Sequence, residues 1–175
     1  MPAKRLSSAL LVAFVVATLS LAGQQSAPAT SATEKNELLI EARGHDPVHL
    51  AIGDLKTMPR LTITIHNSHT NADETYSGVR VADLLTKVGA PLGNDLRGKA
   101  LANYIVATGS DGYQAVIALG EVDPAFHPGE VLVADSMNAK PLDEHNGPLK
   151  LVVSEDKRPA RSVRNLTTIE LRSVQ

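Results

Sequence analysis

Alternating apolar and polar positions mark the strands of this chain. Leu61, Ile63 and Ile65 alternate with threonines and with His66, so one side of this strand faces a core and His66 ends it on the polar side. Leu149, Leu151 and Val153 alternate in the same way with Lys150 and Val152, which predicts a half-buried strand whose Lys150 points away from the core. Further strands are predicted at 37–43, 48–52, 103–108, 114–119, 131–134 and 167–172.

Apolar residues recur with the periodicity of a helix in fewer segments than with that of a strand. One amphipathic helix is predicted where apolar residues recur at i, i+3, i+4 and i+7 and a glycine follows, at Val81, Leu84, Leu85, Val88 and Gly89. Shorter helical pieces are expected before Pro59 and within 119–126. Many strands, few helices and no regular alternation between them predict an α+β domain dominated by sheet.

The N-terminal residues have the pattern of an export signal. Lys4 and Arg5 precede an uncharged, strongly apolar run, and Ser20 and Ala22 are small residues at the positions that precede a cleavage site. We expect residues 1–22 to be a cleaved signal peptide, because the run is shorter than the roughly 20 apolar residues of a retained membrane anchor. Residues 23–35 are rich in Ser, Ala, Pro and Thr and are expected to be a disordered linker, which leaves 36–175 as the domain.

The export signal, the net charge and the composition limit where the protein works and what it binds. We expect a periplasmic or secreted protein with no membrane span after cleavage. Loss of Lys4 and Arg5 would change the formal net charge from −2 to −4, and an acidic chain of this kind does not suggest nucleic-acid binding. The chain has no cysteine and no tryptophan, so its core is expected to be aliphatic and to hold without disulfides.

The segment from 150 to 164 is basic although the chain is acidic. It contains five cationic residues against Glu155 and Asp156, a local balance of +3: Lys150, Lys157, Arg158, Arg161 and Arg164. Such a segment either faces an anion, for which arginine offers bidentate hydrogen bonds, or lies solvated. Arg161 and Arg164 are three residues apart and project to opposite sides of an extended chain, so only a turn would bring them together.

Several polar residues lie where strands end, and each has more than one interpretation. Asp111, in a turn that ends at Tyr113, either accepts hydrogen bonds from a ligand or caps the turn. Tyr113 either stacks on a flat ring or fills a cross-strand site, and Asp135 is either a turn former or a polar contact. His66 and His69, near Asp73 and Glu74, could bind zinc or copper, contact an organic ligand, or lie in solvent.

The order of several short motifs resembles the sulfite-oxidase-type molybdopterin-binding domain. The resemblance spans roughly 61–171 and is carried by Tyr76-Ser-Gly-Val79, Asp111-Gly-Tyr113, Leu119-Gly-Glu121, Asp135, His145-Asn-Gly-Pro-Leu-Lys150 and Arg161-Ser-Val-Arg164. It implies the sulfite oxidase fold, a histidine near the cofactor at His145, and cofactor phosphate contacts at Lys150, Arg161 and Arg164. Capping of Gly147-Pro148 is the alternative role for His145.

The missing cysteine separates this chain from enzymes of that family, which hold molybdenum through a thiolate at the end of an early strand. Here His66 or a neighbour occupies that place. The resemblance to small cysteine-less relatives implies a non-redox protein that binds a tetrahydropterin-like ligand without molybdenum and senses it for the periplasmic domain of a membrane signalling protein. The expected ligand-binding residues are His66, Asp111, Tyr113, Asp135, His145, Lys150, Arg161 and Arg164.

Two other functions stay open at this stage. One is a molybdopterin-dependent oxidoreductase whose metal is held by the pterin dithiolene and by His66. The other is a small metal-binding protein that uses His66 and His69.

Overall fold

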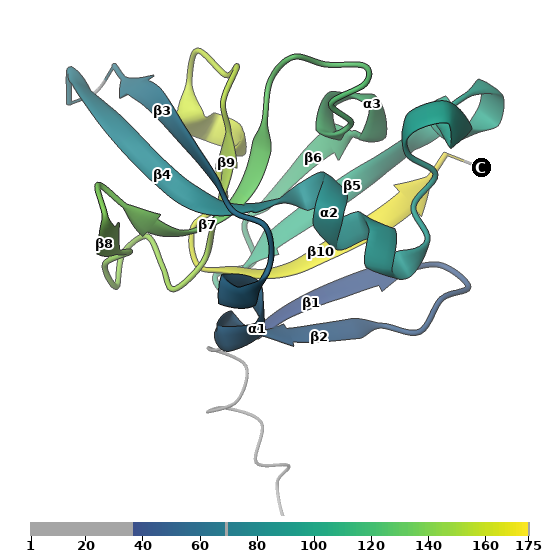
Figure 1. Ribbon diagram of the computed structural model, residues 1–175, viewed down its shortest axis with the longest axis horizontal. Coiled ribbons are helices and arrows are strands. Elements are labelled where there is room, and N and C mark those ends of the chain that lie inside the picture. The colour runs from purple at the N-terminus through teal and green to yellow at the C-terminus, as the bar shows by residue number, and fades with distance from the viewer. Residues whose placement is uncertain (1–36, 69, 175) are drawn as a thin grey trace, which may run out of the picture.

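The strands form two five-stranded sheets in the part of the chain that the computed structural model describes, residues 37–68 and 70–174 (Figure 1). The first sheet has the order β2 (Val48–Ala51), β1 (Glu37–Ala42), β10 (Leu166–Ser173), β5 (Asn103–Gly109) and β6 (Gln114–Ala118). The second has the order β3 (Leu61–Asn67), β4 (Ala72–Arg80), β7 (Val131–Met137) and β8 (Lys140–Pro141), and β9 (Lys150–Val153) also pairs with β7.

Short helices connect the strands. They are α1 (Ile52–Thr57), α2 (Val81–Leu85), η2 (Thr86–Val88), η3 (Gly93–Asp95), η4 (Gly98–Ala102), α3 (Leu119–Val122) and η5 (Pro159–Arg161). The predicted amphipathic helix is confirmed as α2 continued by η2, which ends at Gly89 in the left-handed conformation with φ of 69°. In Figure 1, α2 lies at the centre, where its four apolar positions are buried.

The main core lies between the two sheets. β1 and β5 of the first sheet contribute Leu38, Ile40 and Ile105, and β7 and β9 of the second contribute Val133 and Leu151. Burying each of these side chains is worth about 1.5–3 kcal/mol. The aliphatic core predicted from the composition is confirmed, as is the α+β class.

A second, smaller core covers the other face of the second sheet. It consists of Tyr76, Leu132, Ala134 and Val152, with the β3 residues Leu61, Ile63 and Ile65 partly buried against it. The alternation predicted for β3 is confirmed, because its threonines and His66 are exposed. The half-buried strand predicted for β9 is wrong, since Val152 is completely buried on the face that alternation assigned to solvent. Alternation within β9 cannot show that the second sheet is covered on both faces, because the apolar partners of Val152 come from β4 and β7.

The predicted signal peptide and linker and the residue His69 lie outside the described residues. Across the described ranges, no helix has the length and apolarity needed to cross a bilayer.

Candidate functional site

The turn between β5 and β6 is built as its sequence predicts. Gly112 has φ of 81°, and a carboxylate oxygen of Asp111 accepts a 2.9 Å hydrogen bond from the backbone N–H of Tyr113. The Tyr113 side chain is about half exposed, and its hydroxyl donates a 2.5 Å hydrogen bond to the carbonyl of Ala160 in η5. Asp111 therefore caps its turn, and Tyr113 ties the turn to the basic segment.

The loop from Leu142 to Pro148 is ordered by its own polar groups. Asp143 accepts hydrogen bonds of 2.9 Å from both the backbone N–H and the side-chain amide of Asn146, and these bonds hold the pKa of Asp143 below its usual value. The backbone N–H of Gly147 donates to the carbonyl of Asp143 at 2.8 Å. The Asp143 carboxylate is thus exposed, ionised at neutral pH and fixed in direction.

Asn165 joins this loop to the β5–β6 turn at the start of β10. Its backbone N–H donates to the carbonyl of Asn146, its side-chain amide donates to the carbonyl of His145, and its own carbonyl accepts from Ser110. Three segments that are far apart in sequence are therefore held together at one end of the first sheet.

A cleft of about 1080 Å³ lies between these three segments and β1. We call it the acidic cleft, because its charged residues are the carboxylates Glu37, Asp143 and Glu144, with His49 hydrogen-bonded to Glu37 at 3.1 Å. The turn contributes Gly109, Ser110 and Gly112, and β10 contributes residues 165–168. Its volume slightly exceeds the roughly 300–1,000 Å³ that is typical of small-molecule sites.

A basic cluster lies beside this loop and consists of His145 of the loop, Lys150 at the start of β9 and Arg164 before β10. The Arg164 guanidinium contacts Nε2 of His145, and Lys150 Nζ donates a 3.2 Å hydrogen bond to the side-chain oxygen of Asn146. Burial lowers the pKa of Lys150, and the charge of Arg164 lowers it further against the opposing pull of Glu74 and Asp143. The structure therefore brings together three of the residues that the sequence predicted to bind ligand.

Tyr76 and Glu74 complete this cluster, and the sequence analysis did not include either among the expected ligand-binding residues. Lys150 Nζ donates a 2.9 Å hydrogen bond to the Tyr76 hydroxyl, which donates to Glu74 at 2.7 Å. Burial and the bond to Glu74 raise the pKa of Tyr76. The sequence did contain one signal for this pair: Glu74 and Tyr76 are two residues apart, and side chains at that spacing on one strand lie on the same face.

Asp135 lies at a neighbouring cleft and is paired. Its two carboxylate oxygens accept hydrogen bonds of 2.6 and 2.9 Å from the Arg60 guanidinium, and its side chain is 8% exposed. This second cleft, of about 480 Å³, is also lined by Lys56 and Lys140, and we call it the cationic cleft. Leu142 and Pro148 line both clefts, so the two are adjacent.

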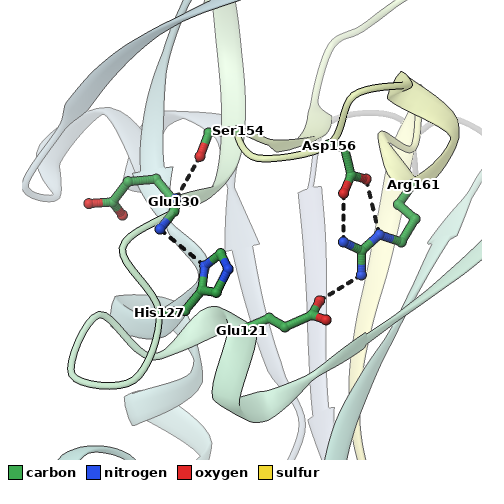
Figure 2. A network of polar contacts seen from close by, with 7 residues as sticks. Glu121, His127, Glu130, Ser154, Asp156 and Arg161 are labelled. Carbon is green, nitrogen blue, oxygen red and sulfur yellow. Dashed lines mark hydrogen bonds and ion pairs between the residues drawn. The ribbon is translucent and has the colours of Figure 1, made fainter.

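Arg161 is tied to the protein rather than to either cleft. Its Nε and Nη2 bind Asp156 at 3.0 and 2.6 Å, and its Nη1 binds Glu121 at 2.6 Å (Figure 2). Arg161 is the last residue of η5, so the segment is not fully extended, and Arg161 and Arg164 have different partners. Arg161 thereby fastens the loop after β9 to α3.

His66 lies at the far end of the β3–β4 hairpin. Its ring is 57% exposed, and Nδ1 is 2.9 Å from a carboxylate oxygen of Asp73. Within residues 37–68 and 70–174, no three or more His, Cys, Asp or Glu side chains are grouped closely enough to hold a metal ion. His66 is therefore not brought to the basic cluster or to the clefts.

The chain belongs to a family of molybdopterin-binding domains. The family described as "Oxidoreductase molybdopterin binding domain" matches residues 24–175. The fold is similar to the crystal structure of the sulfane dehydrogenase SoxCD from Paracoccus pantotrophus, with a TM-score of 0.62 and 18% identity. The similarity covers 82% of this chain but only 40% of that one, and no curated protein matches. The predicted sulfite oxidase fold and family are confirmed.

The side chains present fit the organic part of a molybdopterin-related cofactor better than its metal. The acidic cleft can accept hydrogen bonds from a pterin ring, and the basic cluster can donate to its polar atoms. A thiolate ligand is absent from the whole sequence, and the histidine of the corresponding strand is exposed and paired with Asp73. A neutral imidazole is a harder, less electron-donating ligand than a thiolate.

Proposed function

We propose that this protein is an exported, non-redox pterin-binding protein that acts as a ligand sensor or regulator. The observation that carries this proposal is the position of the loop 142–148, which places an acidic cleft beside a basic cluster in a chain of the molybdopterin-binding family that has no cysteine. A flat ligand with a hydrogen-bond-donating edge and a polar tail matches this distribution of charge.

The acidic cleft is the proposed place of the ring. A pterin presents an amino group and a ring N–H side by side, and a carboxylate can accept both. Asp143 is ionised and oriented, as described above. Glu144 also lines the cleft and, within the described residues, has no hydrogen-bonded or ionic partner of its own. Either carboxylate can take this role without breaking an existing ion pair.

The basic cluster is the proposed place of polar atoms on the pterin side chain. Arg164 is exposed and keeps N–H groups beyond its contact with His145. Lys150 is committed to Tyr76 and Asn146, so it acts by holding Asn146, whose amide in turn orients Asp143. Of the eight residues predicted to bind ligand, His145 and Arg164 thus become the proposed direct contacts, and Lys150 becomes a positioning residue.

The sensor role, the export and the membrane signalling partner rest on the resemblance to cysteine-less relatives and on the N-terminal sequence pattern. A protein that binds a pterin without a metal can report the ligand only by a change in its own surface. Loop 142–148 is suited to this, because it touches the cleft and is held by hydrogen bonds to two other segments.

A molybdopterin-dependent oxidoreductase is the second candidate. It is favoured by the name of the family and by the fold shared with a sulfane dehydrogenase. When bound, the cofactor would supply the redox centre, and His145, Lys150 and Arg164 would hold its organic part. The absence of a thiolate ligand in this chain favours the first candidate.

Extraction of the purified protein distinguishes the two. We expect protein exported by cells that make both reduced pterins and the molybdenum cofactor to release a fluorescent pterin after oxidation, and to contain far less than one molybdenum per chain by elemental analysis. Close to one molybdenum per chain would overturn the first candidate.

Substitutions locate the site. With a tetrahydropterin as the titrant, we expect Asp143→Asn and Glu144→Gln together to weaken binding by about tenfold or more, the value of one charge-assisted hydrogen bond. Glu155→Gln is the matched control, because Glu155 is an exposed carboxylate that lines neither cleft. Equal affinities of the two variants would place the ring elsewhere.

A further inference from the structure

The cationic cleft lies next to the proposed pterin site and has the opposite charge. Lys56 of α1, Arg60 immediately before β3 and Lys140 of β8 line it, against the single carboxylate Asp135. The acidic cleft contains three carboxylates and no Lys or Arg. We propose that the cationic cleft binds an anionic group, a phosphate or a carboxylate, at the end of the ligand whose ring occupies the acidic cleft. This inference rests on the proposed function.

Arg60 forms the fixed part of the cleft. Asp135 holds the guanidinium through two hydrogen bonds, one from Nη1 and one from Nη2, and these bonds raise the pKa of Arg60. A guanidinium has five N–H groups, so three remain available to an anion. Because Asp135 is buried and already fixes the orientation, an anion would meet donors that lose little rotational freedom.

Lys56 and Lys140 form the adaptable part. Both are exposed, both line the cleft, and neither has an ion-pair or hydrogen-bond partner within the described residues. Lys140 follows the β7–β8 turn, where Asn138 and Ala139 have φ of 51° and 61°. Two unpaired ammonium groups beside a fixed guanidinium repel one another, and a bound anion would relieve that repulsion.

The basic segment does not offer an equivalent site. Arg161 is bound by Asp156 and Glu121, and Lys150 is half-buried against Tyr76. Of the three cations that the sequence suggested for phosphate, only Arg164 keeps available N–H groups, whereas three cations line the cationic cleft. The cationic cleft is lined by three cations and one carboxylate, so an anion there would meet a net charge of +2.

The two clefts can be bridged by one small molecule. Leu142 and Pro148 contribute to the walls of both, so a ligand chain of a few atoms that passes these residues would connect ring and anion. Opposite charge in adjacent clefts would also fix which end of the ligand enters which cleft. The ligand class is thus a pterin whose side chain ends in a phosphate or carboxylate, rather than in hydroxyls alone.

The test compares three probes on the full exported chain: a tetrahydropterin with a hydroxylated three-carbon side chain, its terminal phosphate ester, and an analogue that ends in a carboxylate. We expect one or both anionic probes to bind roughly tenfold more tightly than the neutral probe, as expected for charge-assisted hydrogen bonds. The probe that binds more tightly than the neutral probe identifies the anion as a phosphate or a carboxylate. Equal affinity of all three would overturn the inference and leave the pterin proposal standing.

The double variant Lys56→Gln, Lys140→Gln locates the effect. It should bind the neutral probe with the affinity of the wild type, and it should no longer bind the anionic probe more tightly than the neutral one. Lys99→Gln, an exposed lysine of η4 outside both clefts, is the control and should keep that difference. Retention of the difference in the double variant would overturn the inference.

Binding of none of the three probes would contradict the proposed function instead. A titration with inorganic pyrophosphate then tests whether the cationic cleft binds an anion. The side-chain resonances of Lys56 and Lys140 are followed by NMR during this titration. Shifts at both lysines that are absent for Lys99 would support an anion site, and unchanged resonances would overturn it.

Discussion

Lys150 Nζ lies 2.9 Å from the hydroxyl oxygen of Tyr76 and 4.9 Å from the centre of its ring. One ammonium group thus makes a hydrogen bond and a cation–π contact to the same side chain. Tyr76 is on β4 and Lys150 is on β9, and β7 lies between these two strands in the sheet. The pair therefore connects the proposed ligand-binding loop to the second core.

Tyr76→Phe should destabilise the protein by about 1–2 kcal/mol, because Lys150 loses an acceptor and Glu74 a donor at a buried position. Urea denaturation measures this change. Tyr113→Phe removes an exposed hydroxyl and should cost less than about 0.5 kcal/mol. Equal effects of the two substitutions would show that burial of the hydroxyl is not what matters.

Lys150 should make stability depend on pH in the alkaline range. Burial lowers its pKa in the folded state, so between that pKa and about 10.4, the usual value for lysine, the unfolded state binds more protons. Stability from this group therefore increases with pH in that window and is constant below it. We expect the free energy of unfolding of the wild type to rise relative to Lys150→Met as the pH approaches about 10.4 from below. A constant difference would contradict a lowered pKa.

Arg161 and Arg164 should separate stability from binding. Arg161→Ala removes bonds to Asp156 and Glu121 and should lower stability by about 1 kcal/mol, with tetrahydropterin affinity unchanged. Arg164→Ala should leave the unfolding free energy within about 0.5 kcal/mol and weaken binding by about tenfold. Measuring both quantities in both variants tests the assignment, and the reverse pattern would return Arg161 to the ligand site.

Gly78 should tolerate no side chain. A Cβ atom there would lie 2.0 Å from the carbonyl oxygen of Val133 on the neighbouring strand, which is backbone and cannot move aside. Gly78→Ala should destabilise the protein by more than about 3 kcal/mol. Gly120→Ala in α3 meets nothing within 4 Å and should be neutral or slightly stabilising. Thermal unfolding of both variants checks this, and a stable Gly78→Ala protein would mean that β4 and β7 can separate locally.

The sequence determined the elements and the family. Period-2 alternation identified β3, the spacing of Val81 to Val88 identified α2 and η2, and Asp111-Gly112 identified the turn between β5 and β6. These are local properties, because a strand or a turn depends on residues that are near one another in the chain. The ordered motifs from Tyr76 to Arg164 likewise needed no coordinates, and the family match bears them out.

Only the tertiary structure decided which predicted residues meet. It placed His145 and Arg164 in contact, and it paired Asp135 with Arg60, Arg161 with Glu121, and His66 with Asp73. It also buried Val152, which alternation had assigned to solvent. The physical reason is the same in each case: a charged or apolar side chain takes the partner that the sheet order brings near, and that partner can be anywhere in the sequence. Arg60 and Asp135, 75 residues apart, show how far the sequence is from revealing such a pair.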